Sequence, residues 1–145
     1  MTDQVFYEDV AVGDRMPTLT VTVDETQLFF FSAATYNGHR IHYDKEWART
    51  VEGYDDVLVH GPLQAALLAR AIGDWIGGRG RLVSFSVQNR AVAYPGQPLS
   101  FGGEVTGIST VSSRRPAISR SRRPAPLSVR RLPVTSPPKL SGWPG

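Results

Sequence analysis

The sequence predicts an α+β domain in which an antiparallel sheet wraps around one long central helix. Apolar and polar residues alternate at period two early in the chain and again between residues 82 and 108, as they do in strands that bury one face. A helical pattern lies between these stretches, and its many alanines would let a sheet pack closely around it. The order of strand, short helix, long helix and consecutive strands is typical of a sheet curled around one helix.

The first strand is expected at residues 18–23, where apolar residues and threonines alternate. A short helix is expected to follow and to end near Thr35. Asp24, with Gln27 three residues later, resembles a capping box, in which two side chains satisfy free N–H groups at the start of a helix. The apolar block 28–31 contains three consecutive phenylalanines, and we expect it to lie in the core.

The long helix is expected to begin at Gly61-Pro62 and to end at Gly77-Gly78. Proline suits the first turn of a helix because an N–H group there has no partner within the helix. Five residues recur near helical spacing and are expected to face the core: Leu63, Ala66, Leu67, Ala71 and Trp75.

A hairpin is expected after the long helix. Residues 82–92 alternate again, residues 94–98 contain the prolines and the glycine of a turn, and residues 99–108 continue as a strand. Sheets of this kind normally contain further strands after such a hairpin. The sequence that follows the hairpin is therefore where more strands would be expected.

The composition changes at residue 109. Residues 1–108 carry eight basic and 13 acidic residues, a net charge of −5, whereas residues 109–145 carry eight basic residues and no acid. Arg, Pro and Ser dominate this second segment, and its prolines are too frequent for interior strands. We expect one domain over 1–108, lacking its last strands, and a basic tail over 109–145 that is either disordered or the product of a frame change in the gene.

The composition also limits location and chemistry. No apolar run approaches the roughly 20 residues that span a bilayer, and Met1-Thr2-Asp3-Gln4 does not resemble a secretory signal, so we expect a soluble cytoplasmic protein with no membrane partner. The chain has no cysteine, which excludes disulfides, thiolate metal sites and thiol nucleophiles. Because the basic excess belongs to the tail alone, binding of nucleic acid or anionic lipid is the weakest of the alternatives.

Two motifs carry a resemblance to a known family. The run Asn37-Gly38-His39-Arg40-Ile41-His42-Tyr43-Asp44 is followed sixteen residues later by His60-Gly61-Pro62-Leu63. Together they resemble the MaoC-like hydratases and dehydratases, in the branch of 3-hydroxyacyl-thioester dehydratases and mesaconyl-CoA-type hydratases. The resemblance covers about residues 5–108.

This resemblance implies a hotdog fold, a homodimer or higher oligomer, and a coenzyme A or acyl-carrier-protein thioester as substrate. The implied reaction adds water to a 2-enoyl thioester or removes it from a 3-hydroxyacyl thioester. No cofactor is implied. A three-histidine zinc site formed by His39, His42 and His60 has no independent support, and we expect no metal.

The resemblance also assigns catalytic residues, with departures from the family pattern. In the better-known branch the motif is Asp-x-Asn-Pro-x-His, with Asp as the base; here Asn37 takes the Asp position, His39 takes the Asn position, and His42 is retained. A neutral amide cannot act as the base, so His42 is the main catalytic candidate, with His39 as the second proton-transfer group and Asn37 orienting water or carbonyl. Asp44 would fix an imidazole tautomer or brace the loop.

The second motif is expected to bind the thioester. Gly61 lies at the start of the long helix, where its N–H group could polarise the thioester carbonyl, and Leu63 would supply a second donor because Pro62 has none. His60 is a further candidate for substrate binding, with a structural role at the helix start as the alternative. The alternative for the whole protein is a non-catalytic acyl-thioester-binding subunit, since Asn37 replaces the usual carboxylate.

Overall fold

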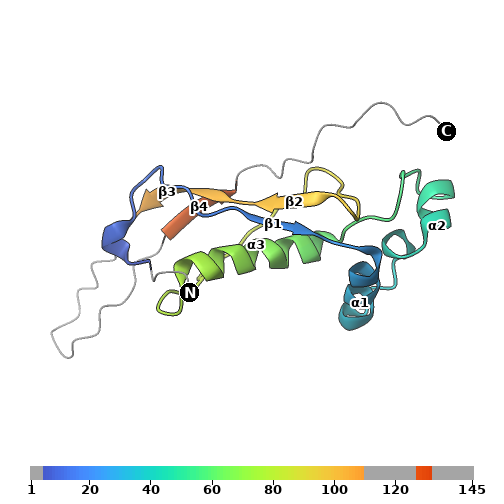
Figure 1. Ribbon diagram of the computed structural model, residues 1–145, viewed down its shortest axis with the longest axis horizontal. Coiled ribbons are helices and arrows are strands. Elements are labelled where there is room, and N and C mark those ends of the chain that lie inside the picture. Colours follow the sequence, from blue (N-terminus) through green and yellow to red (C-terminus); the bar gives the residue numbers. More distant parts are fainter. Residues whose placement is uncertain (1–4, 110–126, 132–145) are drawn as a thin grey trace. The chain divides into compact units, whose positions relative to one another are not determined.

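The computed structural model describes residues 5–109 and 127–131 (Figure 1). These residues belong to two compact units. The first unit is built from four stretches: residues 5–19, 68–86, 101–109 and 127–131. The second unit is built from two stretches: residues 20–67 and 87–100. All six predicted site residues lie in the second unit.

The described helices and strands follow the expected order for most of the chain. The helices are α1 (Glu25–Thr35), α2 (Lys45–Thr50) and α3 (Gly61–Ile76), with short 3-10 turns η1 (Tyr7–Asp9) and η2 (Arg40–His42). The strands are β1 (Leu19–Thr22), β2 (Pro98–Phe101), β3 (Gly103–Ile108) and β4 (Leu127–Arg131). Strand β1 pairs with β2, and β3 pairs antiparallel with β4. None of the helices in these ranges is long and apolar enough to cross a membrane.

The first strand and the first helix form where the sequence predicts them. The capping box is complete: Gln27 N–H donates to Asp24 Oδ1 at 2.7 Å, and Asp24 N–H donates to Gln27 Oε1 at 3.0 Å. The helix ends where Tyr36 adopts the left-handed conformation, with φ of 53°. Both ends of α1 are thus set by local geometry.

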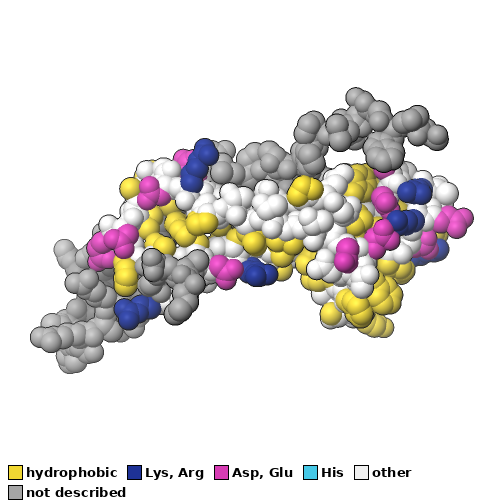
Figure 2. Space-filling model, in the orientation of Figure 1, with side chains coloured by type: hydrophobic (Ala, Val, Ile, Leu, Met, Phe, Trp, Pro, Cys, Tyr) yellow, Lys and Arg dark blue, Asp and Glu magenta, His cyan; other side chains and the backbone are white. Residues whose placement is uncertain are grey.

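The expectation that the phenylalanine block lies in the core is wrong for two of its members. Phe29 is 56% exposed and Phe30 is 64% exposed, whereas Leu28 and Ser32 are buried. Successive residues on a helix point about 100° apart, so three adjacent side chains cannot all face one side. Figure 2 shows the resulting cluster of hydrophobic side chains on the surface around α1.

The long helix has the predicted bounds but a different buried face. Its buried residues lie at i, i+4, i+7 and i+8: Gln64, Leu68, Ala71 and Ile72. Ala66, which the sequence pattern placed in the core, is exposed, while Leu63, Leu67 and Trp75 are half-buried. The helix is therefore buried along one stripe, and that stripe includes a polar glutamine that apolar periodicity does not detect.

The strand predicted at 82–92 is absent from the described structure. This segment has no regular hydrogen-bonded ladder, and Leu82, Val83, Phe85 and Val92 are exposed. The segment expected to pair with it, residues 99–108, instead contributes to β2, and β2 pairs with β1. Alternation shows that a segment can pair, but a strand forms only when a partner is available.

The turn after this segment does form. Gly96 has φ of +78°, which favours glycine, and its N–H group donates to the Val23 carbonyl at 2.8 Å. The predicted boundary at residue 108 stays a prediction. Most of the predicted tail lies outside the described residues, and its described part consists of residue 109 and β4.

Candidate active site

The site is framed by a buried stretch of backbone just before α3. Residues 57–60 are all buried. The Leu58 N–H group donates to the Ile41 carbonyl at 2.8 Å, and the Val59 N–H group donates to the Ala93 carbonyl at 2.8 Å. The bond from Leu58 to Ile41 holds η2, the middle of the first motif, against the residues that lead into the second motif.

His42 has a defined ring orientation. Its Nδ1 lies 2.8 Å from the Leu58 carbonyl oxygen, which can only accept a hydrogen bond, so the proton of the neutral ring is on Nδ1. Nε2 then carries the lone pair, and it has no hydrogen-bond partner among the residues that the structure describes. Burial lowers the pKa of His42, and charge on His39 lowers it further, against a smaller upward effect of the Leu58 hydrogen bond. At neutral pH the ring can therefore accept a proton at Nε2.

His60 is the most buried of the three histidines, with 0% of its surface exposed. Its ring stacks on that of His42, with centroids 3.7 Å apart and an angle of 19° between the planes. Nε2 lies 2.8 Å from the Ser32 hydroxyl, and the Phe31 ring packs edge-on at 4.9 Å. Burial, together with the nearby His42, lowers the pKa of His60 to about 4, so the ring stays neutral at ordinary pH.

Asn37 and His39 form a turn beside these rings. The Asn37 side-chain oxygen accepts a hydrogen bond from the His39 N–H group at 3.1 Å, and His39 Nδ1 accepts one from the Ile41 N–H group at 3.4 Å. The His39 ring is exposed and lies 6.2 Å from the His42 ring, centroid to centroid. Asn37 therefore has a turn role in this structure, and its catalytic role, like that of His39, stays a prediction.

Asp44 braces the loop and does not contact an imidazole in this structure. Its carboxylate caps α2 by accepting from the Trp47 N–H group at 2.9 Å, and it accepts from the Arg40 guanidinium at 2.6 Å. These two partners, the Trp47 N–H group first, hold the pKa of Asp44 below its ordinary value. The tautomer of His42 is fixed instead by the Leu58 carbonyl, a backbone group that the motif does not reveal.

Gly61 is the first residue of α3 and directly follows His60 in the chain. Its N–H group has no hydrogen-bond partner among the described residues, as is usual in the first turn of a helix. A Cβ atom added at Gly61 would run into the side-chain amide of Asn89. The N–H group is therefore available to a carbonyl oxygen, and the absence of a side chain leaves room for Asn89.

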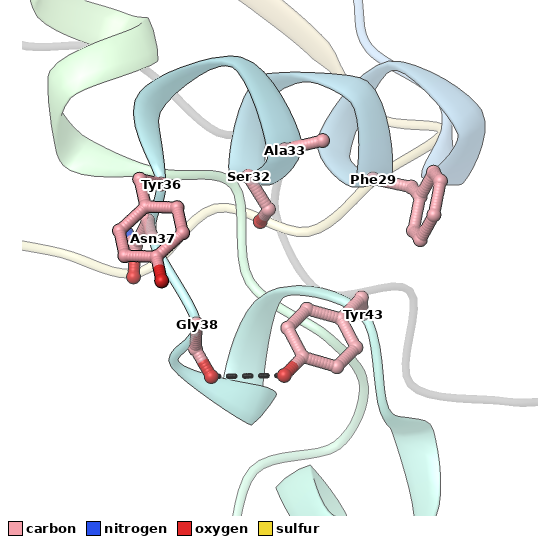
Figure 3. A pocket seen from close by; sticks show the side chains of 7 residues that line it. All are labelled: Phe29, Ser32, Ala33, Tyr36, Asn37, Gly38 and Tyr43. Atoms are coloured by element: carbon pink, nitrogen blue, oxygen red, sulfur yellow. Dashed lines mark hydrogen bonds between the residues drawn. The ribbon is translucent and has the colours of Figure 1, made fainter.

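Two pockets flank helix α1. The first has a volume of about 460 Å³ and is lined by Phe29, Ser32, Ala33, Tyr36, Asn37, Gly38 and Tyr43, with the Tyr43 hydroxyl donating to the Gly38 carbonyl at 2.8 Å (Figure 3). The second has a volume of about 360 Å³ and is lined by Val21, Val23, Gln27, Phe30, Phe31, Ala34, Leu63 and Leu67. His60 contacts one lining residue of each, Ser32 of the first and Phe31 of the second. Leu63, a predicted substrate-binding residue, lines the second pocket.

No group of three or more His, Asp or Glu side chains within the described ranges is arranged to hold a metal ion. The three histidines are instead engaged with one another and with Leu58, Ser32 and Ile41. Sequence reasoning did not find Ser32. Its one available signal was a polar residue within an apolar helical block.

The two glycines of α3 allow a matched pair of substitutions. Gly61→Ala is expected to stabilise the protein less than Gly73→Ala does, because the new methyl group must first displace the side-chain amide of the exposed Asn89. Gly73→Ala is expected to stabilise it by about 0.5–1 kcal/mol, because Gly73 has nothing within 4 Å and alanine is the better helix former. Urea unfolding of both variants measures the two effects, and a Gly61→Ala protein as stable as Gly73→Ala would contradict the close approach of Asn89.

Comparison with known proteins gives both family and fold. A family model described as hydroxyacyl-thioester dehydratase type 2 matches residues 9–95, more than half of the chain. Over 51 residues the chain is 57% identical to mesaconyl-C(4)-CoA hydratase of Chloroflexus aurantiacus and 43% identical to the mitochondrial hydroxyacyl-thioester dehydratase type 2 of Saccharomyces cerevisiae. Each match covers 35% of this chain and 18% of the relative, so the chain matches less than a fifth of the length of these curated relatives.

Among solved structures, the ChsH1-ChsH2 complex from Mycobacterium tuberculosis is similar to this chain, with 25% sequence identity and a TM-score of 0.63. The similarity covers 69% of this chain and 78% of that chain. With its other structural neighbours, it confirms the α+β hotdog fold that the sequence predicts.

Proposed function

Because the chain belongs to the hydroxyacyl-thioester dehydratase type 2 family, we propose that it hydrates 2-enoyl thioesters or, in reverse, dehydrates 3-hydroxyacyl thioesters. The observation that carries this proposal is the orientation of His42. Its Nδ1 proton is held by the Leu58 carbonyl, which leaves Nε2 as a base. The proposed substrate is an acyl thioester of coenzyme A or of an acyl carrier protein, and the proposed reaction needs no cofactor.

In the proposed hydration, Nε2 of His42 takes a proton from water while the water oxygen bonds to C3 of the enoyl group. The electron pair of the double bond moves towards the thioester carbonyl, whose oxygen gains negative charge. The free N–H group of Gly61, at the positive end of the 16-residue helix α3, stabilises that charge. The His42 imidazolium then returns its proton to C2, which completes the addition of one water molecule.

The other predicted residues have supporting roles in this proposal. His39 is the second proton-transfer group of the proposal: its ring lies 6.2 Å from that of His42, and it could relay the proton that the His42 imidazolium gives up towards C2. Asn37, on the lining of the first pocket, orients water or the carbonyl. His60 and Leu63 belong to the substrate-binding part of the proposal, Leu63 through the second pocket. Assembly as a homodimer or higher oligomer and a cytoplasmic location remain predictions of the sequence.

A spectrophotometric assay with crotonyl-CoA tests the activity. We expect the enoyl absorbance to fall, and we expect kcat/KM to be flat near neutral pH and to decline only below about pH 6.5, the ordinary pKa of histidine. The sign follows from the lowered pKa of His42: the base is lost only when the pH falls through that lowered value. A decline in kcat/KM that begins well above about pH 6.5 as the pH is lowered would contradict the role of His42 as the base.

The alternative function is a non-catalytic subunit that binds an acyl thioester. Two observations favour it: Asn37 replaces the carboxylate of the family motif, and one similar solved structure is a complex of two proteins. Folded protein that binds crotonyl-CoA with no turnover would support this alternative and reject catalysis by the chain alone.

A further inference from the structure

His60 is a buried titratable group that the proposed proton transfers do not use. Its ring is held on three sides, by the Ser32 hydroxyl at 2.8 Å, by the edge-on Phe31 ring at 4.9 Å and by the stacked His42 ring at 3.7 Å. Its Nδ1 is buried and has no hydrogen-bond partner within the described part of the chain. A buried polar atom without a partner costs free energy, so an apolar ring would be the more stable choice unless the imidazole had another role.

The geometry of the stack suggests that role. With its face 3.7 Å away and only 19° from parallel, the His60 ring covers one face of His42. The Leu58 carbonyl fixes the His42 ring at Nδ1 only, and rotation about that hydrogen bond would still be possible. The stacked ring removes this freedom, and it also excludes water from one face of His42.

Charge supports the same role. A neutral ring stacked on His42 adds no positive charge beside it, so it does not repel the imidazolium that His42 becomes. Two imidazolium rings at this distance would repel each other, so His60 can perform this role only while it is uncharged. Its burial and its single polar contact, with a neutral serine, keep it uncharged.

We infer that His60 is a positioning residue: clamped by Ser32 and Phe31, its ring is the platform that holds the His42 imidazole in its single orientation. The effect of His60 on catalysis rests on the proposed function. The orientation of the His42 ring on the platform does not, because it can be observed without substrate. It also gives Ser32 a function, because the Ser32 hydroxyl sets the rotation of the His60 ring.

Nitrogen-15 NMR of the histidine rings tests the platform in the absence of turnover. The chain has three histidines, so the spectrum contains the nitrogen signals of three imidazoles, and a His39→Gln protein identifies those that belong to His39. In the wild type we expect His42 as the Nδ1–H tautomer with a pKa below its ordinary value. His39 and His60 are the titratable side chains that contact the His42 ring among the described residues.

Two variants separate the ring from its polar contact. His60→Gln keeps a polar group that can reach Ser32 but removes the ring, and we expect the pKa of His42 to rise by about half a pH unit or more and its two tautomers to mix. His60→Phe keeps a ring and loses the serine bond, and we expect the His42 tautomer to be retained while its signals broaden, as in a platform that is present but no longer clamped by Ser32. An unchanged tautomer and pKa of His42 in folded His60→Gln would overturn the inference.

Ser32→Ala supplies a milder route if either His60 variant fails to fold, with Thr35→Val as its matched control. Both changes remove a hydroxyl from α1, but Thr35 donates only within the helix, to the Phe31 carbonyl at 2.6 Å. Ser32→Ala should broaden the His60 and His42 signals and lower kcat at least threefold with little change in KM, while Thr35→Val should do neither. Equal spectra for the two variants would count against the platform whether or not the protein turns over crotonyl-CoA.

Discussion

Replacing His42 by alanine is expected to lower kcat at least about a hundredfold, the usual scale for the loss of a proton-transfer group. His42 supplies a free ring nitrogen with a fixed lone pair, because Leu58 holds the proton on the other nitrogen. The substitution removes a half-buried side chain with one hydrogen bond, so the protein should remain folded. The measurement is steady-state hydration of crotonyl-CoA by the purified variant.

His39→Ala is the natural comparison for this experiment, since it removes a second imidazole that is exposed. It should cost less activity than His42→Ala because no carbonyl of the described residues fixes its ring and its Nδ1 already accepts a backbone hydrogen bond. Near-normal kcat in folded His42→Ala would remove His42 from the mechanism. A larger loss in His39→Ala would assign the base to His39 instead.

Mild acid is expected to destabilise the protein, and His60 is the main reason. Its pKa is about 4 in the folded protein, against an ordinary value of roughly 6.5 in the unfolded chain, so the unfolded chain binds the extra proton between these two values. This contribution to stability is complete above about pH 6.5 and is lost as the pH falls towards about 4. The expected loss between pH 7 and pH 4.5 is on the order of 2 kcal/mol.

Urea unfolding at several pH values measures this effect. His42, whose pKa is also lowered, contributes in the same direction, whereas Asp44 contributes only below its ordinary pKa, since its folded pKa is lowered as well. His60→Gln should therefore remove most of the pH dependence above about pH 4.5. Equal free energies of unfolding at pH 7 and pH 4.5 in the wild type would show that His60 is not buried as a neutral ring.

The parts of the fold that depend only on residues close together in the chain could be predicted from the sequence. The capping box of Asp24 and Gln27 and the bounds of α3 both follow from short patterns. The errors concern which side faces the core and which strands pair. Phe29 and Phe30 are exposed and residues 82–92 form no strand, because both outcomes depend on partners far away in the chain.

The candidate site shows the same division. The two motifs identified His42 and His60, and the structure stacks their rings although they are 18 positions apart in the sequence. The groups that fix these rings could not be predicted. The Leu58 carbonyl belongs to the backbone and leaves no trace in residue identity, and the Ser32 hydroxyl reaches His60 across 28 positions of sequence.

The central claim is that the free nitrogen of His42 and the N–H group of Gly61 act on one thioester. A crystal structure with the amide analogue of 3-hydroxybutyryl-CoA, in which nitrogen replaces the thioester sulfur and the carbonyl is kept, tests it most directly. We expect Nε2 of His42 within roughly 2.6–3.2 Å of the 3-hydroxyl oxygen, and Gly61 N at a similar distance from the carbonyl oxygen. An analogue bound with its 3-hydroxyl away from His42, or its carbonyl away from Gly61, would contradict the claim.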